Sequence, residues 1–181
     1  MRPVRYNVAA SLDGYIAATG GEYDWIPDDP TVDFAAIFAP VDTVLLGRVS
    51  YEVTRRIGGP WPTGARLYVF SRTLRASNHP GVTIVADRAA DTVARLRAEA
   101  GEGEIWLYGG GQLFGHLLAA GQVDCVEVTV VPVLLGGGIP LLAPGSLTST
   151  DAGRAPLALR DTRRYPSGMV TLTYDVLGAR R

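Results

Sequence analysis

The sequence has 181 residues, 47% hydrophobic and 19% charged, which is enough for one folded domain with its own hydrophobic core. The formal net charge of −1 provides no broad positive surface for a phosphate backbone, so nucleic acid is a poor candidate partner. All 17 basic residues are arginine, which excludes a lysine Schiff base and the lysine-containing phosphate loop.

Cysteine and histidine are too few to suggest a disulfide framework or a metal centre. Cys125 is the single cysteine, and the two histidines, His79 and His116, stand far apart without a metal-ligand spacing. The N-terminus shows no signal-peptide pattern, and no apolar run reaches spanning length without Gly or Pro. We therefore expect one domain over residues 1–181 that is soluble, cytoplasmic, free of metal and not associated with a membrane.

The first quarter of the chain predicts strands that alternate with helices. An apolar strand is expected over Val4–Ala10, followed by a long polar loop over residues 11–30. A loop of that length in a compact domain is usually functional or mobile. The pattern then predicts a helix over Val32–Phe38, a strand over Thr43–Leu46 and a helix that begins at Arg48.

The middle of the chain continues the alternation. Strands are expected over Arg66–Phe70, Val82–Ala86 and Glu104–Tyr108. An amphipathic helix fits Ala89–Ala100, and a second helix is expected from Gln112 to about Ala119, directly after three glycines.

The last third of the chain consists of consecutive strands. A long alternating strand is expected over Val123–Val133, and a closing antiparallel hairpin over Leu157–Arg164 and Met169–Leu177. Together these elements predict an α/β fold with three αβα layers and a mixed, mainly parallel sheet that ends in the antiparallel hairpin. Ligands of such sheets bind beyond the carboxyl ends of the strands, so the segments that follow strands are the candidate site.

Three of these segments share one layout, in which an apolar strand ends at a small residue beside a possible anion-binding group. Gly47 permits close backbone approach and Arg48 offers a planar fork for phosphate. Ser71 and Arg72 repeat the arrangement, and the glycines at 109–111 would admit a pyrophosphate against a helix N-terminus. The alternatives are that both arginines are ordinary solvated loop residues and that the glycines serve only the turn.

Four motifs together resemble the riboflavin-biosynthesis reductase domains within the dihydrofolate-reductase-like family. In chain order they are SLDGYIA at 11–17, LGRVSYE at 46–52, YGGG at 108–111 and PVLLGGG at 132–138. The resemblance spans nearly the whole chain. It implies a dihydrofolate-reductase-like fold and an NADPH-dependent reductase whose substrate is a small heterocycle of the 5-amino-6-ribosylamino-pyrimidine or pterin/dihydrofolate class. It also implies a homodimer, for which the valines and leucines of the strand at 126–133 offer a contact surface.

The resemblance further implies which residues hold the cofactor. Two arginines converging on the 2′-phosphate would favour NADPH over NADH. The implied cofactor-binding residues are Ala9, Ala10, Gly47, Arg48, Val49, Ser50, Ser71, Arg72, Tyr108, Gly109, Gly110, Gly111, Gln112 and Leu113.

Reduction of a C=N or C=O bond also requires a proton, from an acid or from ordered water. Asp33, at the start of a predicted helix, and Asp13, in the loop expected to cover the nicotinamide, are the candidate acids. Asp13 and Trp25 are also candidate substrate contacts. The alternatives are that Asp33 only complements the helix dipole, that Asp13 forms a turn and that Trp25 anchors the loop.

Two other functions remain open at this point. The riboflavin-pathway enzymes bind a ribose phosphate and generally carry a deaminase domain, whereas this chain has no lysine to hold that phosphate and is too short for a second domain. A related protein that binds the nucleotide without turnover on these substrates is one alternative. An unrelated α/β domain with purely structural glycine turns is the other.

Overall fold

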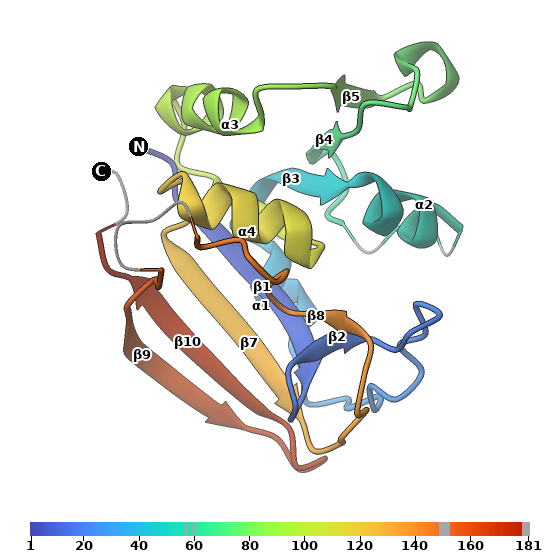
Figure 1. Ribbon diagram of the computed structural model, residues 1–181, viewed down its shortest axis with the longest axis vertical. Coiled ribbons are helices and arrows are strands. Elements are labelled where there is room, and N and C mark those ends of the chain that lie inside the picture. Colours follow the sequence, from blue (N-terminus) through green and yellow to red (C-terminus); the bar gives the residue numbers. More distant parts are fainter. Residues whose placement is uncertain (57, 60, 149–152, 179–181) are drawn as a thin grey trace.

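An eight-stranded sheet forms the centre of the computed structural model, which describes residues 1–56, 58–59, 61–148 and 153–178 (Figure 1). The strand order is β5-β4-β3-β6-β1-β7-β10-β9, and a second small sheet pairs β2 with β8. The strands are β1 (Val4–Ser11), β2 (Tyr15–Ala17), β3 (Val41–Gly47), β4 (Arg66–Phe70), β5 (Val82–Val85), β6 (Glu104–Gly109), β7 (Cys125–Val131), β8 (Ile139–Pro140), β9 (Leu157–Arg164) and β10 (Val170–Val176). The helices are α1 (Phe34–Phe38), α2 (Arg48–Arg56), α3 (Ala89–Ala98) and α4 (Gly111–Ala119), with a short 3-10 turn at Ala76–Asn78.

The sheet is mainly parallel, as the alternation of strands and helices predicts. Strands β5, β4, β3, β6, β1 and β7 run parallel, whereas β10 pairs antiparallel with both β7 and β9. The expected C-terminal hairpin therefore closes one side of the sheet. The α/β fold class and the mixed sheet are confirmed.

Helices cover both faces of the sheet, which gives the three expected layers (Figure 1). On one face, α3 and α4 bury Val93, Leu96 and Leu117 against the even-numbered side chains of β1 and β7. Tyr6 of β1 stacks on Phe114 of α4 with a centroid separation of 3.9 Å. On the other face, α1 and α2 pack over the β3–β6 region. Strands β3 and β6, at the centre of the sheet, therefore bury apolar side chains on both faces.

The long loop expected over residues 11–30 contains a short strand that the sequence pattern did not predict. Strand β2 pairs antiparallel with β8, which lies more than 120 residues later in the chain. Helix α1 begins at Phe34 instead of Val32, because the Asp33 carboxylate accepts a hydrogen bond from the Ala36 amide and so caps the helix.

Strand β7 does not offer the subunit surface expected from its valines. Both of its edges are hydrogen-bonded, one to β1 and the other to β10. Val126, Val128 and Val131 are each at most 9% exposed. The prediction that β7 provides a subunit contact surface is therefore wrong, because these side chains belong to the core of the chain. The homodimer itself stays a prediction.

Candidate functional site

The strand register brings four chain segments together at the carboxyl edge of the sheet. Gly47 pairs with Phe70, and Phe70 pairs with Val85 on the next strand. On the other side of β3, Leu46 pairs with Gly109 at the end of β6. The segments that leave β3, β4, β5 and β6 therefore start side by side, as the rule for parallel sheets predicts.

Three helices begin in this row, and their N-termini face the same cavity. The first residues of α2, α3 and α4 line it, at 48–50, 89 and 111–113. No side chain caps α3 or α4: the N-cap positions, Arg88 and Gly110, make no side-chain cap hydrogen bond. The first amides of these helices are therefore available to an anion, which the helix dipole also attracts.

Arginines add positive charge at the same end of the cavity. Arg48, Arg72 and Arg88 all line it. Arg48 is held by Glu52 at 2.6 Å within α2, and Arg88 by Asp91 at 2.8 Å within α3. Within the described part of the chain, Arg72 makes no ion pair or hydrogen bond, so its guanidinium fork is free to bind a phosphate.

The glycine turn after β6 serves both packing and access. Gly109 has a φ of +127°, which favours glycine. A Cβ on Gly111 would lie well inside 3.0 Å of the Pro140 carbonyl oxygen, so the backbone of β8 packs directly on the start of α4. Of the three turn glycines, Gly110 borders the cavity without a steric conflict, since a Cβ there would only reach van der Waals contact with the Ser50 hydroxyl at 3.4 Å. The turn is therefore structural at Gly109 and Gly111, and Gly110 lets a ligand approach the backbone.

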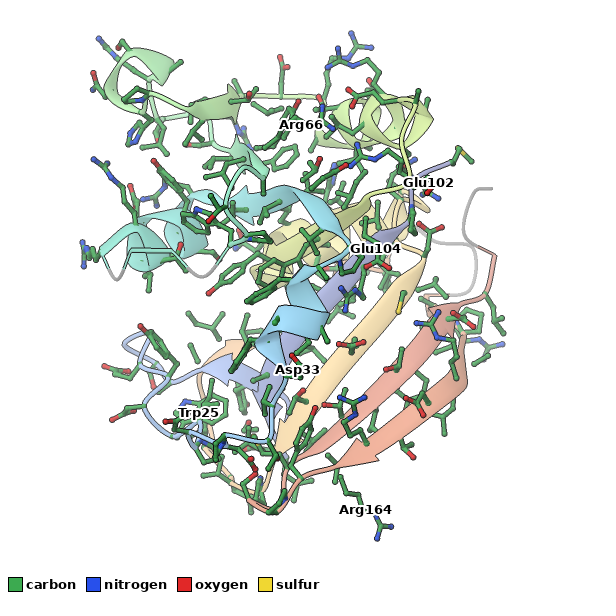
Figure 2. The ribbon with its side chains drawn as sticks, turned by 180° about the vertical axis from the view of Figure 1, so that it is seen from behind. Trp25, Asp33, Arg66, Glu102, Glu104 and Arg164 are labelled. Atoms are coloured by element: carbon green, nitrogen blue, oxygen red, sulfur yellow. The ribbon has the colours of Figure 1, made fainter. Side chains whose placement is uncertain are left out.

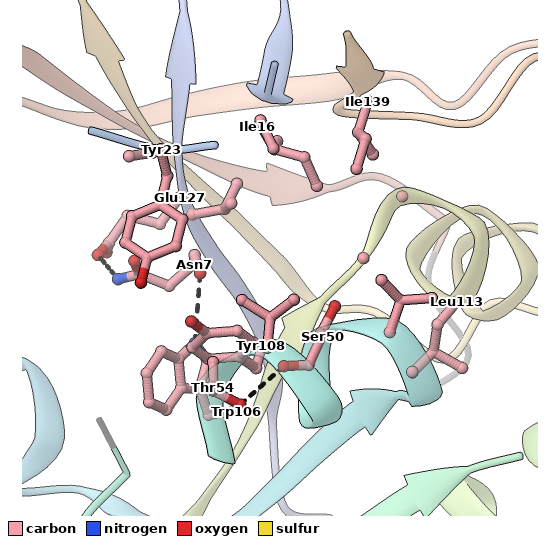
Figure 3. Close-up of a pocket in the computed structure, with 18 of the residues that line it drawn as sticks. Asn7, Ile16, Tyr23, Ser50, Thr54, Trp106, Tyr108, Leu113, Glu127 and Ile139 are labelled. Atoms are coloured by element: carbon pink, nitrogen blue, oxygen red, sulfur yellow. Dashed lines mark hydrogen bonds between the residues drawn. The ribbon is translucent and has the colours of Figure 1, made fainter. Parts of the chain in front are cut away.

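One cavity of about 1540 Å³ connects this anion-binding end to a second region (Figure 3). Pockets for single small ligands measure about 300–1,000 Å³. The volume therefore suits a large nucleotide together with a second, smaller molecule.

Aromatic side chains form one wall of the second region. Trp106 lies between Phe38 of α1, at 5.0 Å between ring centroids, and Tyr108, at 5.2 Å. The Trp106 indole N–H donates to the backbone carbonyl of Asn7 at 3.3 Å. Tyr23, from the loop between β2 and α1, lines the same region (Figure 3). Burial raises the pKa of Tyr108 to about 12, so its hydroxyl is protonated at neutral pH and can donate a hydrogen bond.

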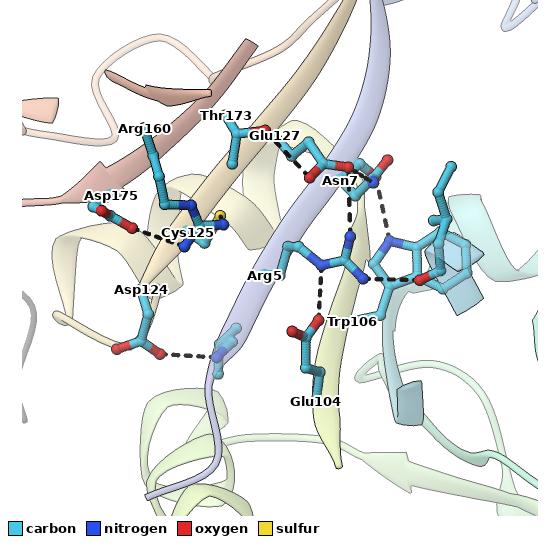
Figure 4. Close-up of polar contacts among 12 residues, drawn as sticks. Arg5, Asn7, Glu104, Trp106, Asp124, Cys125, Glu127, Arg160, Thr173 and Asp175 are labelled. Carbon is cyan, nitrogen blue, oxygen red and sulfur yellow. Dashed lines mark hydrogen bonds and ion pairs between the residues drawn. The ribbon is translucent and has the colours of Figure 1, made fainter. Parts of the chain in front are cut away.

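Polar side chains from β1 and β7 form the floor of this region (Figure 4). Asn7 and Glu127 are opposite each other in the parallel pairing of β1 with β7, and the Asn7 amide donates to the Glu127 carboxylate. The Arg5 guanidinium contacts Glu127 at 3.4 Å and Glu104 at 2.8 Å. A charged, hydrogen-bonded cluster therefore lies beside the aromatic wall.

The structure brings most of the predicted cofactor residues to one cavity. Of that set, the lining residues are Ala9, Gly47, Arg48, Val49, Ser50, Ser71, Arg72, Tyr108, Gly110, Gly111, Gln112 and Leu113. Two predicted residues lie outside it. Ala10 is 1% exposed and packs in the core on the opposite face of the sheet, and Gly109 is buried within the turn.

Asp13, Asp33 and Trp25 are absent from the described residues that line the cavity. Asp33 is occupied in capping α1, and the Trp25 indole donates to the Glu22 carbonyl within its own loop (Figure 2). This placement agrees with the structural alternatives for both residues.

Asp13 joins two of the sequence motifs instead of reaching into the cavity. Its carboxylate accepts from the Gly136 amide at 2.7 Å and from the Ser11 hydroxyl at 2.6 Å. The Ser11 hydroxyl and the amides of Gly136 and Leu135 lower the pKa of Asp13, so it is ionised at neutral pH. The ionised Asp13 carboxylate therefore links two loops by hydrogen bonds and has no proton to donate to a substrate.

Sequence reasoning missed two parts of the site. The segment after β5, at 86–89, follows the same rule as the three predicted segments, so the predicted strand at Val82–Ala86 was a sufficient signal. Asn7 and Glu127 lie within strands, and nothing in the sequence shows that they share a cavity floor. That requires the β1–β7 register. No cluster of metal-binding side chains occurs among the residues that the structure describes.

Comparison with known proteins agrees with this geometry. Residues 2–171 match the model of the RibD C-terminal domain. The chain belongs to this family. Two uncharacterized proteins of Bacillus subtilis (strain 168) are relatives of this RibD C-terminal domain. YyaP is 30% identical over 185 residues, covering 96% of this chain and 94% of its own length. YwjB is 34% identical over 138 residues, covering 74% and 79%.

Solved structures share the fold of this RibD C-terminal domain. A Shewanella sp. PV-4 protein, provisionally named a riboflavin biosynthesis protein, has a TM-score of 0.79 at 27% identity, covering 97% of this chain and 99% of that chain. The Thermotoga maritima diaminohydroxyphosphoribosylaminopyrimidine deaminase/5-amino-6-(5-phosphoribosylamino)uracil reductase has a TM-score of 0.70 at 19% identity, covering 97% of this chain but 57% of that one. A pyrimidine reductase-like protein from Corynebacterium diphtheriae has a TM-score of 0.67 at 15% identity, covering 97% and 92%.

The family resemblance expected from the four motifs is therefore confirmed. The helices of this RibD C-terminal domain, over the residues described, are all too short or too polar to span a bilayer.

Proposed function

We propose that this chain is an NADPH-dependent reductase that acts on a small nitrogen heterocycle of the pyrimidine or pterin class. One observation carries the proposal: a single cavity joins an anion-binding end, built from helix N-termini and arginines, to an aromatic pocket with a polar floor. The reductase named among the structural relatives supports the reaction class.

The anion-binding end fits a dinucleotide phosphate. The uncapped starts of α3 and α4 supply amides for a pyrophosphate, and Gly110, which lines the cavity, has no side chain to separate it from the backbone. Arg48 and Arg72 follow neighbouring strands and provide two guanidinium groups for a 2′-phosphate, which NADH lacks. When bound, NADPH supplies the hydride.

The second region fits a flat heterocycle. Trp106 and Tyr108 offer ring faces, and the Tyr108 hydroxyl and the Asn7 amide offer hydrogen bonds to ring nitrogens. Because the Asp13 carboxylate is tied to the loop at Gly136 and Asp33 caps α1, neither is placed to deliver the proton. We propose that the proton comes from water that reaches the open cavity or from the Tyr108 hydroxyl.

Calorimetric titration with NADPH and NADH tests the cofactor assignment. We expect NADPH to bind more tightly, and we expect Arg72→Ala to weaken NADPH about tenfold while it leaves NADH nearly unchanged. Charged hydrogen bonds contribute about 1.5–3 kcal/mol, and solvent exposure of Arg72 reduces that contribution. Arg75→Ala, an exposed arginine outside the cavity lining, is the matched control. Equal NADPH binding by both variants would refute the role of Arg72.

Turnover is tested separately. We expect NADPH absorbance to fall on addition of a 5-amino-6-ribosylamino-pyrimidine or of dihydrofolate. Tight NADPH binding without oxidation on any such substrate would favour the nucleotide-binding protein without turnover, and absence of NADPH binding would refute the reductase proposal.

A further inference from the structure

Glu127 is the carboxylate on the floor of the aromatic pocket. It comes from the middle of β7, and its side chain is 16% exposed. Of the carboxylates in the Arg5 cluster, it alone lines the cavity, whereas Glu104 does not (Figures 3 and 4). Glu127 is thus a largely buried carboxylate that faces a cavity, and its neighbours indicate which groups it can bind.

Three neighbours hold the Glu127 carboxylate in place. One oxygen accepts from the Asn7 amide and from the Arg5 guanidinium, the latter at 3.4 Å. The other oxygen has one donor, the Thr173 hydroxyl, also at 3.4 Å. An ionised carboxylate has about four acceptor sites, so the oxygen that contacts Thr173 keeps one site for a further donor. Asn7 lines the same cavity, and its side-chain oxygen is a second acceptor.

The Arg5 cluster itself carries a net negative charge. The Arg5 guanidinium is only 11% exposed, donates to Glu104 at 2.8 Å and to the Ile37 carbonyl at 2.9 Å, and lies farther from Glu127. One guanidinium thus faces two carboxylates, which leaves one negative charge uncompensated within this cluster. If Glu127 served only to neutralise Arg5, Glu104 would already suffice at the shorter distance.

We propose that Glu127 and Asn7 form the recognition edge for an amino-substituted nitrogen heterocycle, and that Glu127 determines this specificity. The inference rests on the proposed function in taking the heterocycle as the substrate. The two hydrogens of an exocyclic amino group donate to the Glu127 and Asn7 oxygens, while the ring lies against Trp106 and Tyr108. A heterocycle with carbonyl oxygens in place of the amino groups places acceptors against acceptors and is rejected.

Calorimetry without NADPH tests the recognition edge, with 2,4-diaminopyrimidine and its dioxo analogue uracil as probes. The wild-type chain is expected to bind the diamino compound at least about tenfold more tightly than uracil. Glu127→Gln removes the charge and is expected to reduce diaminopyrimidine affinity about tenfold or more and to abolish the preference. Glu102→Gln, on the exposed loop between α3 and β6, is the matched control and should bind as the wild type does.

A second variant keeps the test decisive if Glu127→Gln fails to fold, as judged by circular dichroism and thermal melting. Asn7→Leu keeps the branched arrangement of the side-chain heavy atoms and retains the carboxylate but removes the neighbouring amide, and it should reduce the preference several-fold. The proposal is overturned if the wild type shows no preference for the diamino probe, or if the folded variants keep it.

NADPH titration of the same proteins separates this inference from the proposed function. Glu127→Gln should bind NADPH as tightly as the wild type, because Glu127 lies on β7, whereas the anion-binding segments follow β3, β4, β5 and β6. If NADPH does not bind but the amino preference depends on Glu127, the reductase proposal fails and the recognition edge stands. If NADPH binds and the amino preference is absent, the recognition edge alone is refuted.

Discussion

Replacing Gly111 by alanine tests whether the start of α4 is fixed by direct backbone packing on β8. The added Cβ would lie well inside 3.0 Å of the Pro140 carbonyl oxygen and at 3.0 Å from that of Leu141. Both atoms belong to the backbone, so neither can turn away as a flexible side chain would. The backbone angles of Gly111 are not in the left-handed region, so the predicted loss comes from the collision alone.

The magnitude follows from the cost of overpacking, about 1–3 kcal/mol, against a gain in helix propensity of up to about 1 kcal/mol. We expect the Gly111→Ala variant to lose about 2 kcal/mol in its free energy of unfolding. For a chain of this size, that loss corresponds to a fall in Tm of about 4–8 °C. Because the shift displaces the first amides of α4, NADPH binding should weaken as well.

Thermal and urea unfolding measure the effect, with Gly137→Ala as the matched control. A Cβ on Gly137 meets no atom within 4 Å, and its φ is not in the left-handed region. We expect the control to change stability by less than about 0.5 kcal/mol. Equal stability of the two variants would show that β8 does not press on the start of α4, and the packing argument would be wrong.

Two further predictions concern other parts of the fold. Burial raises the pKa of the Cys125 thiol to about 11, so its thiolate fraction at pH 8 is about 0.1%. Iodoacetamide should therefore label Cys125 at pH 8 at least about 100-fold more slowly in the native chain than in the unfolded chain. The labelling rate of the native chain should rise as the pH approaches 11. Fast labelling of the native chain at pH 8 would contradict this prediction. Asp29 accepts from the Ser167 amide at 3.1 Å and from the Thr31 amide at 2.9 Å, and thereby ties the loop before α1 to the β9–β10 turn. Asp29→Ala should speed backbone hydrogen exchange at Ser167 and in residues 18–33, whereas Asp24→Ala, at an exposed position, should not. Equal exchange in both variants would show that Asp29 does not hold these two segments together.

The sequence by itself determined the order and type of most elements. Apolar strands alternating with amphipathic helices indicate a mainly parallel sheet, and the consecutive strands at the end indicate the antiparallel hairpin. The rule that ligands bind beyond parallel strands then located the segments at Gly47, Ser71 and Gly110, which do line one cavity. These features were predictable because local periodicity and chain order fix them.

The tertiary structure decided which side chains face that cavity. Asp13 and Asp33 look in sequence like any acid beside a glycine or a helix start, but a hydrogen bond from Gly136 holds Asp13 in the loop and one from Ala36 makes Asp33 the cap of α1. Glu127 looks like a strand residue, and only its pairing opposite Asn7, 120 residues away, places it on the floor of the pocket. Contacts between distant segments depend on strand register, and a one-residue change in the β1–β7 register would turn Glu127 to the face of the sheet opposite Asn7.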